Sequence, residues 1–258
     1  MGVADVVSQK PGGSYVDDFT GYMAIVAEHF RGRAKSLSVL DLPAGAGRMA
    51  DALRAAGHQV VCADINRERP DYVYADMSAP LPFADGAFEA VVCLEGIEHL
   101  SEPSLLVREL SRVTKSGGEI VITTPNVMSL YSRLHQLLTG APYQFNQALV
   151  VPAAAGAVLD RGHISPLSYF QLRQMFEEHG VRVAAVRGDR FKRMILAPVY
   201  LALLPLVGLA SWVMLIRGGD RGRRSRNAEL LRHALSPPLL LSRSLVLFLA
   251  KPAASPLP

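Results

Sequence analysis

The segment at 39–50, Val-Leu-Asp-Leu-Pro-Ala-Gly-Ala-Gly-Arg-Met-Ala, constrains the fold of this chain more than any other. An apolar run ends at Asp41, a turn of small residues contains Gly45 and Gly47, and a helical pattern follows. This order predicts a strand, a turn and a helix, in which the glycines let a ligand approach the backbone and the helix N-terminus directs N–H groups at it. The segment therefore predicts a site for a nucleotide-type cofactor.

Strands and helices alternate through most of the chain. The expected strands are 37–42, 59–64, 72–75, 88–94, 119–124, 181–186 and 244–250. The expected helices are 18–30, 48–56, 104–113, 128–138 and 167–179, and a mobile stretch of small residues is expected at 150–158. Alternation of this kind predicts an α/β fold with a doubly wound, mostly parallel sheet. A turn at Gly117 and Gly118 is expected to precede the strand at 119–124.

Charge is distributed unevenly along the chain. Residues 1–186 hold 15 Lys and Arg against 20 Asp and Glu, whereas residues 187–258 hold 12 against 3. Because the excess basic charge lies in the C-terminal part, an anionic membrane surface is a better expected partner than a nucleic acid. Cys62 and Cys93 fall in expected buried strands, and residues 1–36 show no signal-peptide pattern, so we expect reduced cysteines and a cytoplasmic location.

The glycine turn fits a loose cofactor pattern. Gly45–Ala50 matches G-x-G-x-x-G/A, which by itself suits NAD(P), FAD or S-adenosylmethionine. Asp64, at the end of the next strand, has the placement needed to accept hydrogen bonds from both ribose hydroxyls. The alternative is a structural turn with two glycines and a helix-capping Asp.

Two further acids separate these cofactors. Asp41 directly precedes the turn, where a carboxylate would repel a pyrophosphate but attract the ammonium group of a methionine moiety. After the third strand, Asp76 can accept from an adenine amino group, and Met77 can cover the ring. These positions favour S-adenosylmethionine over a nicotinamide cofactor.

Two longer blocks, 81–92 and 108–126, together with His163 ahead of a helix that ends near 179–181, complete a recognisable order of motifs. This order resembles the class I S-adenosylmethionine-dependent methyltransferases, of the type 11 and ubiquinone-pathway O-methyltransferase kind, over about 35–190 plus the last strand. The resemblance implies a Rossmann-like seven-stranded sheet. The cofactor-binding residues that it implies are Asp41, Ala44, Gly45, Ala46, Gly47, Asp64, Ile65, Asp76, Met77 and Leu94. Two departures are Pro43, in place of the family's first turn glycine, and Ser116, in place of a usual proline.

Candidate catalytic residues follow the strand 88–94. The sequence Glu95-Gly-Ile-Glu98-His99 is similar to one that is associated with a divalent metal in ubiquinone-pathway and small-RNA 2′-O-methyltransferases. On a helical turn Glu95, Glu98 and His99 would share a face, and oxygen-rich ligation suits Mg²⁺ or Mn²⁺. His163 would complete the set. The candidate catalytic residues are therefore Glu98, His99 and His163, and the alternative is that Glu98 and His99 are structural, so that metal binding stays open.

The C-terminal part contains an apolar insertion. Residues 194–216 carry no charge and are long enough to cross a hydrocarbon core, although Pro198, Pro205 and Gly208 interrupt them. In the resembled fold, however, the strands before and after 191–242 lie in one sheet, and arginines flank the apolar run on both sides. We expect residues 191–242 to form an interfacial or re-entrant helical hairpin on an anionic membrane, appended to a domain of residues 1–190 and 243–258. The alternative is a cover for the substrate cleft or a dimer interface.

Together these features predict a cytoplasmic methyltransferase that is peripheral or monotopic on the membrane. It is expected to transfer a methyl group to oxygen on a membrane-presented acceptor, either a lipid-linked glycan or sugar, which the insertion slightly favours, or a polyprenylated quinone precursor. One alternative is an NAD(P)-dependent oxidoreductase, which Asp41 disfavours. Another is a non-catalytic membrane adaptor, against which Asp41, Asp64 and Asp76 argue.

Overall fold

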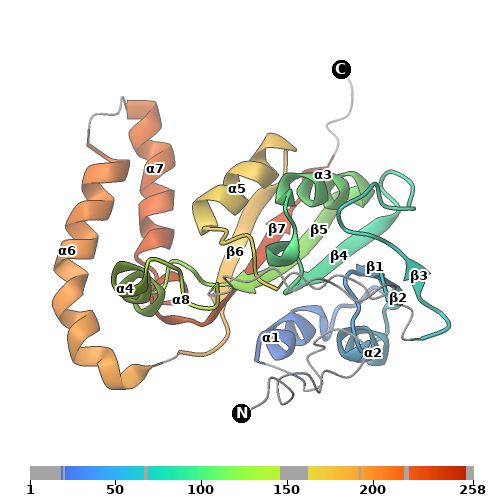
Figure 1. The fold of residues 1–258 in the computed structure, drawn as a ribbon. Helices are drawn as coiled ribbons and strands as arrows, with labels where there is room; N and C mark the ends of the chain where they lie inside the picture. The colour runs from blue at the N-terminus through green and yellow to red at the C-terminus, as the bar shows by residue number, and fades with distance from the viewer. Residues whose placement is uncertain are drawn as a thin grey trace, which may run out of the picture.

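A seven-stranded sheet forms the centre of the molecule (Figure 1). The computed structural model describes residues 19, 21–66, 69–145, 162–191, 193–217 and 221–253, with only the backbone described at 221–226. The strands are β1 (Ser38–Asp41), β2 (Gln59–Asp64), β3 (Val73–Tyr74), β4 (Phe88–Leu94), β5 (Thr114–Pro125), β6 (Arg182–Gly188) and β7 (Ser244–Ala250). They lie in the order β3-β2-β1-β4-β5-β7-β6, and only β7 runs antiparallel to its neighbours. The predicted doubly wound, mostly parallel sheet is confirmed.

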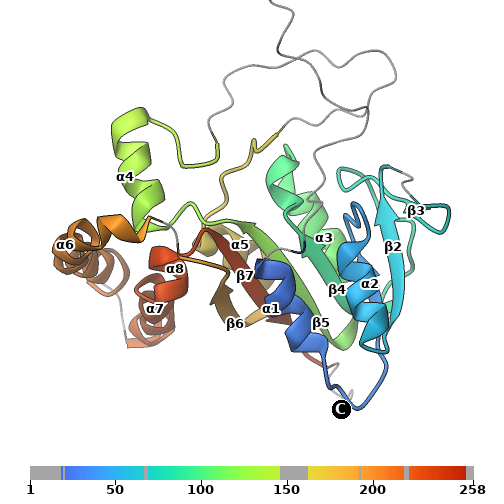
Figure 2. The ribbon, with the colours of Figure 1, turned by 90° about the horizontal axis from the view of Figure 1, so that it is seen from below.

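Helices cover both faces of this sheet. In Figures 1 and 2, α1 (Gly21–Phe30) and α2 (Arg48–Ala55) lie on one face, and α3 (Pro103–Val113) and α5 (Tyr169–Glu178) lie on the other. The strands explain this arrangement, because neighbouring residues point to opposite faces. Ile120 belongs to the apolar cluster under α3 and α5, whereas Val121 belongs to the cluster under α1 and α2. The central strands are therefore buried on both faces, as parallel strands usually are.

The fifth strand begins earlier than the sequence predicts. Thr114 pairs with Phe88 and Glu119 pairs with Ala90, so the residues between them form an irregularity within β5 in place of a turn before it. Gly118 is required there, because a Cβ atom at this position would lie 2.7 Å from the backbone oxygen of Glu89. The helix expected at 18–30 begins at Gly21, and the stretch expected to be mobile, 150–158, lies outside the described residues.

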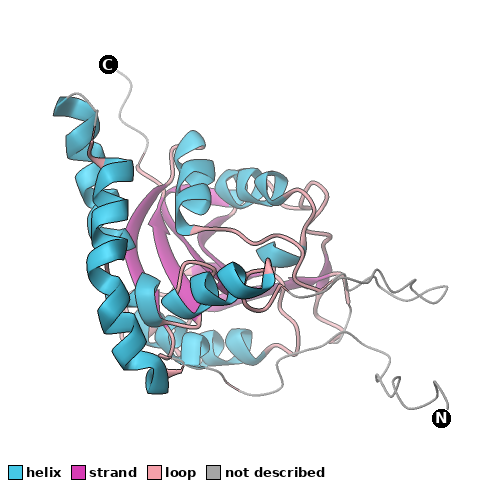
Figure 3. Ribbon diagram, turned by 60° about the vertical axis from the view of Figure 1, so that its left-hand side comes forward, coloured by secondary structure: helices cyan, strands magenta, loops and turns pink. Residues whose placement is uncertain are grey.

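Four helices lie beyond the β6 edge of the sheet: α4 (Leu130–Thr139), α6 (Ala197–Leu215), α7 (Arg221–Ala234) and α8 (Pro237–Leu241). Phe191 and Ser242 pair in an antiparallel bridge, and the Arg243 N–H donates to the Arg190 carbonyl over 3.0 Å. The chain therefore leaves the sheet and returns to it at one place. Between these points α6 and α7 form a hairpin that stands off the sheet (Figures 1 and 3).

Helix α6 exposes most of its apolar surface. Its exposed large apolar side chains are Val199, Leu201, Leu204, Leu206, Leu209, Trp212, Val213 and Met214. Among the described residues, one helical stretch, Met194–Leu215, is long and apolar enough to cross a membrane by length and composition. Exposed apolar surfaces of this kind are typical of sites that contact another apolar partner.

Candidate active site

Side chains from β2 and from the segment after it hydrogen-bond to the glycine turn between β1 and α2. Gly47 adopts a φ of +77° at the start of α2, a conformation that side chains disfavour. The buried carboxylate of Asp64 accepts from the Gly45 N–H and from the Asn66 N–H, both over 2.9 Å. The Tyr72 hydroxyl donates to the Gly45 carbonyl over 3.1 Å. Asp64 therefore anchors the turn in addition to the role in ribose binding that the sequence predicts for it.

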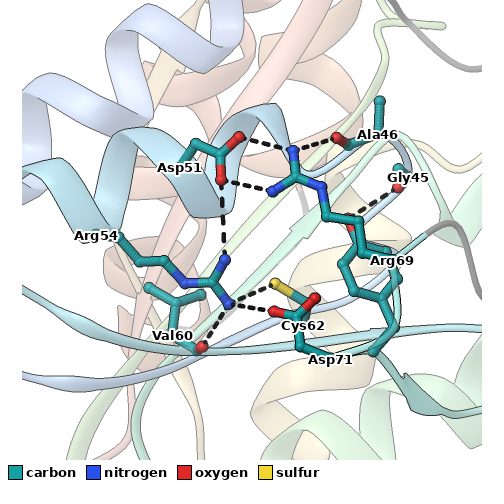
Figure 4. A network of polar contacts seen from close by, with 9 residues as sticks. Gly45, Ala46, Asp51, Arg54, Val60, Cys62, Arg69 and Asp71 are labelled. Atoms are coloured by element: carbon teal, nitrogen blue, oxygen red, sulfur yellow. Dashed lines mark hydrogen bonds and ion pairs between the residues drawn. The ribbon is translucent and has the colours of Figure 1, made fainter.

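An arginine lies across the outer side of the turn (Figure 4). Arg69 donates to both oxygens of Asp51 over 2.7 Å and to the Ala46 carbonyl over 2.8 Å. A Cβ atom at Gly47 would lie 2.5 Å from the Arg69 Cζ, so any side chain at this position would displace the guanidinium. Sequence reasoning missed both Arg69 and Tyr72, because no motif marks the segment that carries them.

Asp41 is a buried acid with an incomplete set of partners. Its side chain is 1% exposed, and Oδ2 has no hydrogen-bond partner among the described residues. Burial raises the pKa of Asp41 to about 7. A hydrogen bond from the Ala50 N–H lowers this pKa by a smaller amount, and the nearby charge of Asp64 raises it further. A buried carboxylate oxygen without a partner fits a cationic ligand group, as the ammonium of S-adenosylmethionine would be.

Three loops meet beside this turn, at the carboxyl edge of β1, β3 and β4. A Cβ atom at Gly96 would lie 2.7 Å from the Pro43 Cδ and 3.2 Å from the Met77 Cε, so the three residues are in close contact. Asp76 Oδ1 accepts from the Ser78 N–H over 2.8 Å and from its hydroxyl over 2.7 Å. Met77 and Asp76 therefore lie at the sheet edge where the adenine contact is expected.

The remaining predicted cofactor residues differ in exposure. Ala44 is buried and its N–H donates to the Ala63 carbonyl over 3.0 Å, whereas Ile65 is half-buried. Leu94 packs into the apolar cluster under α1 and α2. Leu94 thus contributes mainly to the core at the end of β4, and only 7% of its surface is exposed. Its place in the cofactor cleft stays a prediction.

Glu98, His99 and His163 come together at the end of β4. The rings of His99 and His163 meet edge to face with centroids 4.9 Å apart, and one side-chain ligand atom from each of the three residues lies within 4.8 Å of the others. The N–H groups of Ile164 and Ser165 both donate to the Glu98 carbonyl over 2.9 Å, which ties the His163 segment to this turn. The grouping of the three candidate catalytic side chains is a direct result of this backbone pairing.

Two carboxyl groups in this region are buried without full compensation. Glu98 is fully buried, and burial and the nearby Glu95 raise its pKa well above the usual value. Burial likewise raises the pKa of Glu95 to about 7, and a hydrogen bond with Thr123 opposes that shift. Glu95 has a φ of +47° and precedes the short 3₁₀ helix η2 (Ile97–His99). The expectation that Glu95 shares one helical face with Glu98 and His99 is therefore wrong, because the helical turn begins after it.

The donor set at this point does not suit Mg²⁺, which the sequence leaves open as a ligand. The described residues bring together one carboxylate and two imidazoles. Mg²⁺ prefers oxygen ligands and several waters in an octahedral shell, whereas a fully buried carboxylate beside two imidazoles offers mainly nitrogen. The chemistry of this site therefore gives Mg²⁺ no support.

Comparison with known proteins adds a family match and partial sequence relatives. A family model described as a methyltransferase domain matches residues 17–186. A demethylmenaquinone methyltransferase of Renibacterium salmoninarum is 38% identical over 94 residues, which cover 33% of this chain and 39% of the relative. A malonyl-[acyl-carrier protein] O-methyltransferase of Erwinia pyrifoliae is 32% identical over 145 residues, which cover 51% of this chain and 55% of the relative. The chain thus spans about two fifths to one half of the length of these relatives.

A solved structure matches a larger share of the chain. The S-adenosylmethionine-dependent methyltransferase from Archaeoglobus fulgidus superimposes with a TM-score of 0.52 at 17% identity, covering 89% of this chain and 94% of that one. At this identity the match shows a shared fold.

Proposed function

Because the chain belongs to the methyltransferase family, as a class I S-adenosylmethionine-dependent enzyme, we propose that it methylates a lipid-linked acceptor presented at a membrane. The observation that carries the acceptor class is the exposed apolar surface of α6, on a hairpin whose two ends join the catalytic sheet at one place. The matched methyltransferase model favours this function over the nicotinamide-dependent alternative.

The cofactor would be held by three acids on three successive strand ends. Asp41 offers a buried, unpartnered oxygen to the ammonium group. Asp64 keeps the glycine turn in place and presents its remaining lone pairs to the ribose hydroxyls. Asp76 and Met77 would contact the edge and face of the adenine. When bound, S-adenosylmethionine supplies an activated methyl group, and in-line transfer then depends mainly on how the acceptor is positioned.

The acceptor would be received by the imidazole pair at the end of β4. We assign His99 or His163 to accept the proton of the acceptor hydroxyl as its oxygen is methylated. Glu98 lies within 4.8 Å of these imidazoles, and a positive charge formed there would favour its ionised form, which stabilises the imidazolium. General base catalysis is a modest contribution beside positioning, so the pair is expected to act chiefly on the rate and little on cofactor affinity.

The α6–α7 hairpin would place this site at the surface of a bilayer. The apolar side chains of α6 suit the acyl boundary, and the arginine-rich sequence 217–226 suits anionic headgroups on the cytoplasmic side. Entry and exit at the Phe191–Ser242 bridge favour an interfacial or re-entrant hairpin over a single crossing, because β7 returns to the same sheet as β6.

Transfer of a labelled methyl group tests this function. Purified protein, S-adenosylmethionine with a labelled methyl group, and a bacterial membrane extract should yield a labelled product that partitions into organic solvent. The matched control is the Asp41→Asn variant, which should lose the signal. Mass spectrometry of the product then distinguishes a lipid-linked glycan from a polyprenylated quinone. Absence of labelled lipid from a protein that binds the cofactor would contradict the proposed acceptor class.

A further inference from the structure

A cavity of about 490 Å³ lies between α4, α5 and α6. Its walls are largely apolar and include Met128 and Pro142 from the segments around α4, Phe170 from α5 and Met214 from α6. The volume lies in the range of sites that bind small ligands.

Among the described residues that line this cavity, one carries a charge. Arg133, on α4, is the only charged residue among the described lining residues, which contain no Asp or Glu. Among the described residues no carboxylate forms an ion pair with Arg133, in contrast to Arg173 on the neighbouring α5, which pairs with Glu177 and Glu229. Burial lowers the pKa of Arg133, and no acid among the described residues opposes that effect. A partly buried guanidinium without a counter-charge is a site that an anion would stabilise.

The start of α5 adds positive potential to the same cavity. Ser168, the N-cap of α5, and Phe170 in its first turn both line the cavity. The N–H groups of a helix's first turn carry partial positive charge and favour an anion. The helix terminus and Arg133 therefore both favour an anion in the cavity.

The cavity adjoins the candidate active site through one short segment. Pro166 lines the cavity, and the two residues before it, Ile164 and Ser165, donate to the Glu98 carbonyl beside His99. A ligand in the cavity would therefore lie next to the segment that carries His163.

We propose that this cavity binds the phosphate or diphosphate of a lipid-linked acceptor, with the Arg133 guanidinium as its counter-ion and the lipid chain along α6. The identity of this ligand as the acceptor rests on the proposed function, whereas binding of an anionic amphiphile does not. The site selects an acceptor whose head is attached to its lipid through phosphate, and it disfavours a neutral polyprenylated quinone.

Binding of octyl phosphate to the full chain tests the site directly. Calorimetric titration follows binding without a reporter side chain, since Trp212 is 48% exposed on α6 and does not line the cavity. Octyl phosphate below its micelle concentration should bind in a saturable manner. Octyl glucoside, a neutral amphiphile, and inorganic phosphate, which lacks a chain, should each bind at least tenfold more weakly.

Three variants separate the role of Arg133 from general effects of charge. Arg133→Gln should weaken octyl phosphate at least tenfold, and Arg133→Lys should recover part of the loss because it keeps the charge. Arg187→Gln is the matched control, because Arg187 is exposed on β6 and lines a different hollow beside α1. Unchanged affinity in Arg133→Gln, or equal binding of octyl glucoside or inorganic phosphate, would overturn the proposal.

Cofactor titration keeps the two proposals distinguishable. All three variants should bind S-adenosylhomocysteine as the unsubstituted chain does. Failure of every form to bind S-adenosylhomocysteine would contradict the proposed function and leave the anion site standing. Intact cofactor binding with unchanged octyl phosphate affinity in Arg133→Gln would remove only the anion site.

Discussion

Asp64 and Gly45 are joined by a hydrogen bond of 2.9 Å from the Gly45 N–H to the carboxylate. This contact connects the end of β2 to the turn that follows β1, so the acid expected to bind the ribose also fixes the backbone expected to lie against the rest of the cofactor. Folding and cofactor binding therefore depend on the same side chain at this point.

The two glycines with left-handed backbone at either end of α2 give a matched pair of variants. Gly47→Ala and Gly57→Ala each place a side chain at positive φ, which costs about 1–2 kcal/mol of folding free energy. Only Gly47→Ala brings a Cβ atom to 2.5 Å from Arg69, whereas nothing lies within 4 Å at Gly57. Urea unfolding should show destabilisation of both variants, at least as large in Gly47→Ala, and calorimetric titration should show weakened S-adenosylhomocysteine binding in Gly47→Ala alone. Equal affinities would argue against a role of the turn in binding.

Asp41 should make the stability of the protein depend on pH. Its folded-state pKa of about 7 exceeds the usual 3.8, so the folded protein holds a proton that the unfolded chain releases between about pH 4 and 7. Stability contributed at this site is therefore lost as pH rises through that window, by up to about 4 kcal/mol. The charged neighbours that also shift this pKa are Asp64, Asp51 and Arg54.

The substitution Asp41→Asn isolates the contribution of Asp41 to the pH dependence of stability. Relative to the unsubstituted chain, Asp41→Asn should gain stability steadily as pH is raised from about 4 to 7, as measured by urea unfolding at a series of pH values. Asp71→Asn serves as the control, because Asp71 is exposed and pairs with Arg54. A stability difference for Asp41→Asn that stays constant across the series would contradict the assignment.

The imidazole pair should affect turnover more than cofactor affinity. His99→Gln is expected to lower kcat by about 10²–10⁴-fold, the usual contribution of a general base, with S-adenosylhomocysteine affinity little changed. His179→Gln, an exposed histidine at the end of α5, is the control and should leave both quantities unchanged. Retention of full kcat by His99→Gln and by His163→Gln would remove the pair from the mechanism.

The apolar face of α6 should determine membrane binding. Leu206 and Leu209 are 63% and 60% exposed, so replacing both by Ser should leave the fold intact. Loss of two leucines from a bilayer contact should weaken binding to phosphatidylglycerol-containing vesicles by at least about tenfold in sedimentation assays. Tyr74→Ser, at a 51% exposed position on β3, is the control. Vesicle binding that survives the double substitution would contradict an interfacial role of α6.

Much of the fold follows from the sequence because its signals are local. The apolar strands, the glycine turn and the stop at Gly180 each carry a backbone or burial requirement that can be recognised without tertiary information. The early start of β5 could not be recognised in this way, because Thr114 joins the sheet only through its pairing with Phe88. The residues between Thr114 and Glu119 form an irregularity that depends on the neighbouring strand β4.

The candidate site was predictable in part for the same reason. The sequence identifies Asp41, Asp64 and the Glu98–His99 pair by their positions after strands. It does not identify Arg69 above Gly47, because that contact crosses from the segment after β2 to the turn after β1. Nor does it place Glu95 correctly, because the left-handed conformation of this residue ends the helical spacing on which that prediction depends.

Calorimetric titration with S-adenosylhomocysteine tests the central claim most directly. The account predicts saturable binding of one ligand per chain, weakened by about 1–3 kcal/mol in Asp64→Ala, which removes both the ribose contact and the anchor of Gly45. A folded protein that takes up no ligand at millimolar concentration, or an Asp64→Ala variant that binds as tightly as the unsubstituted chain, would contradict it.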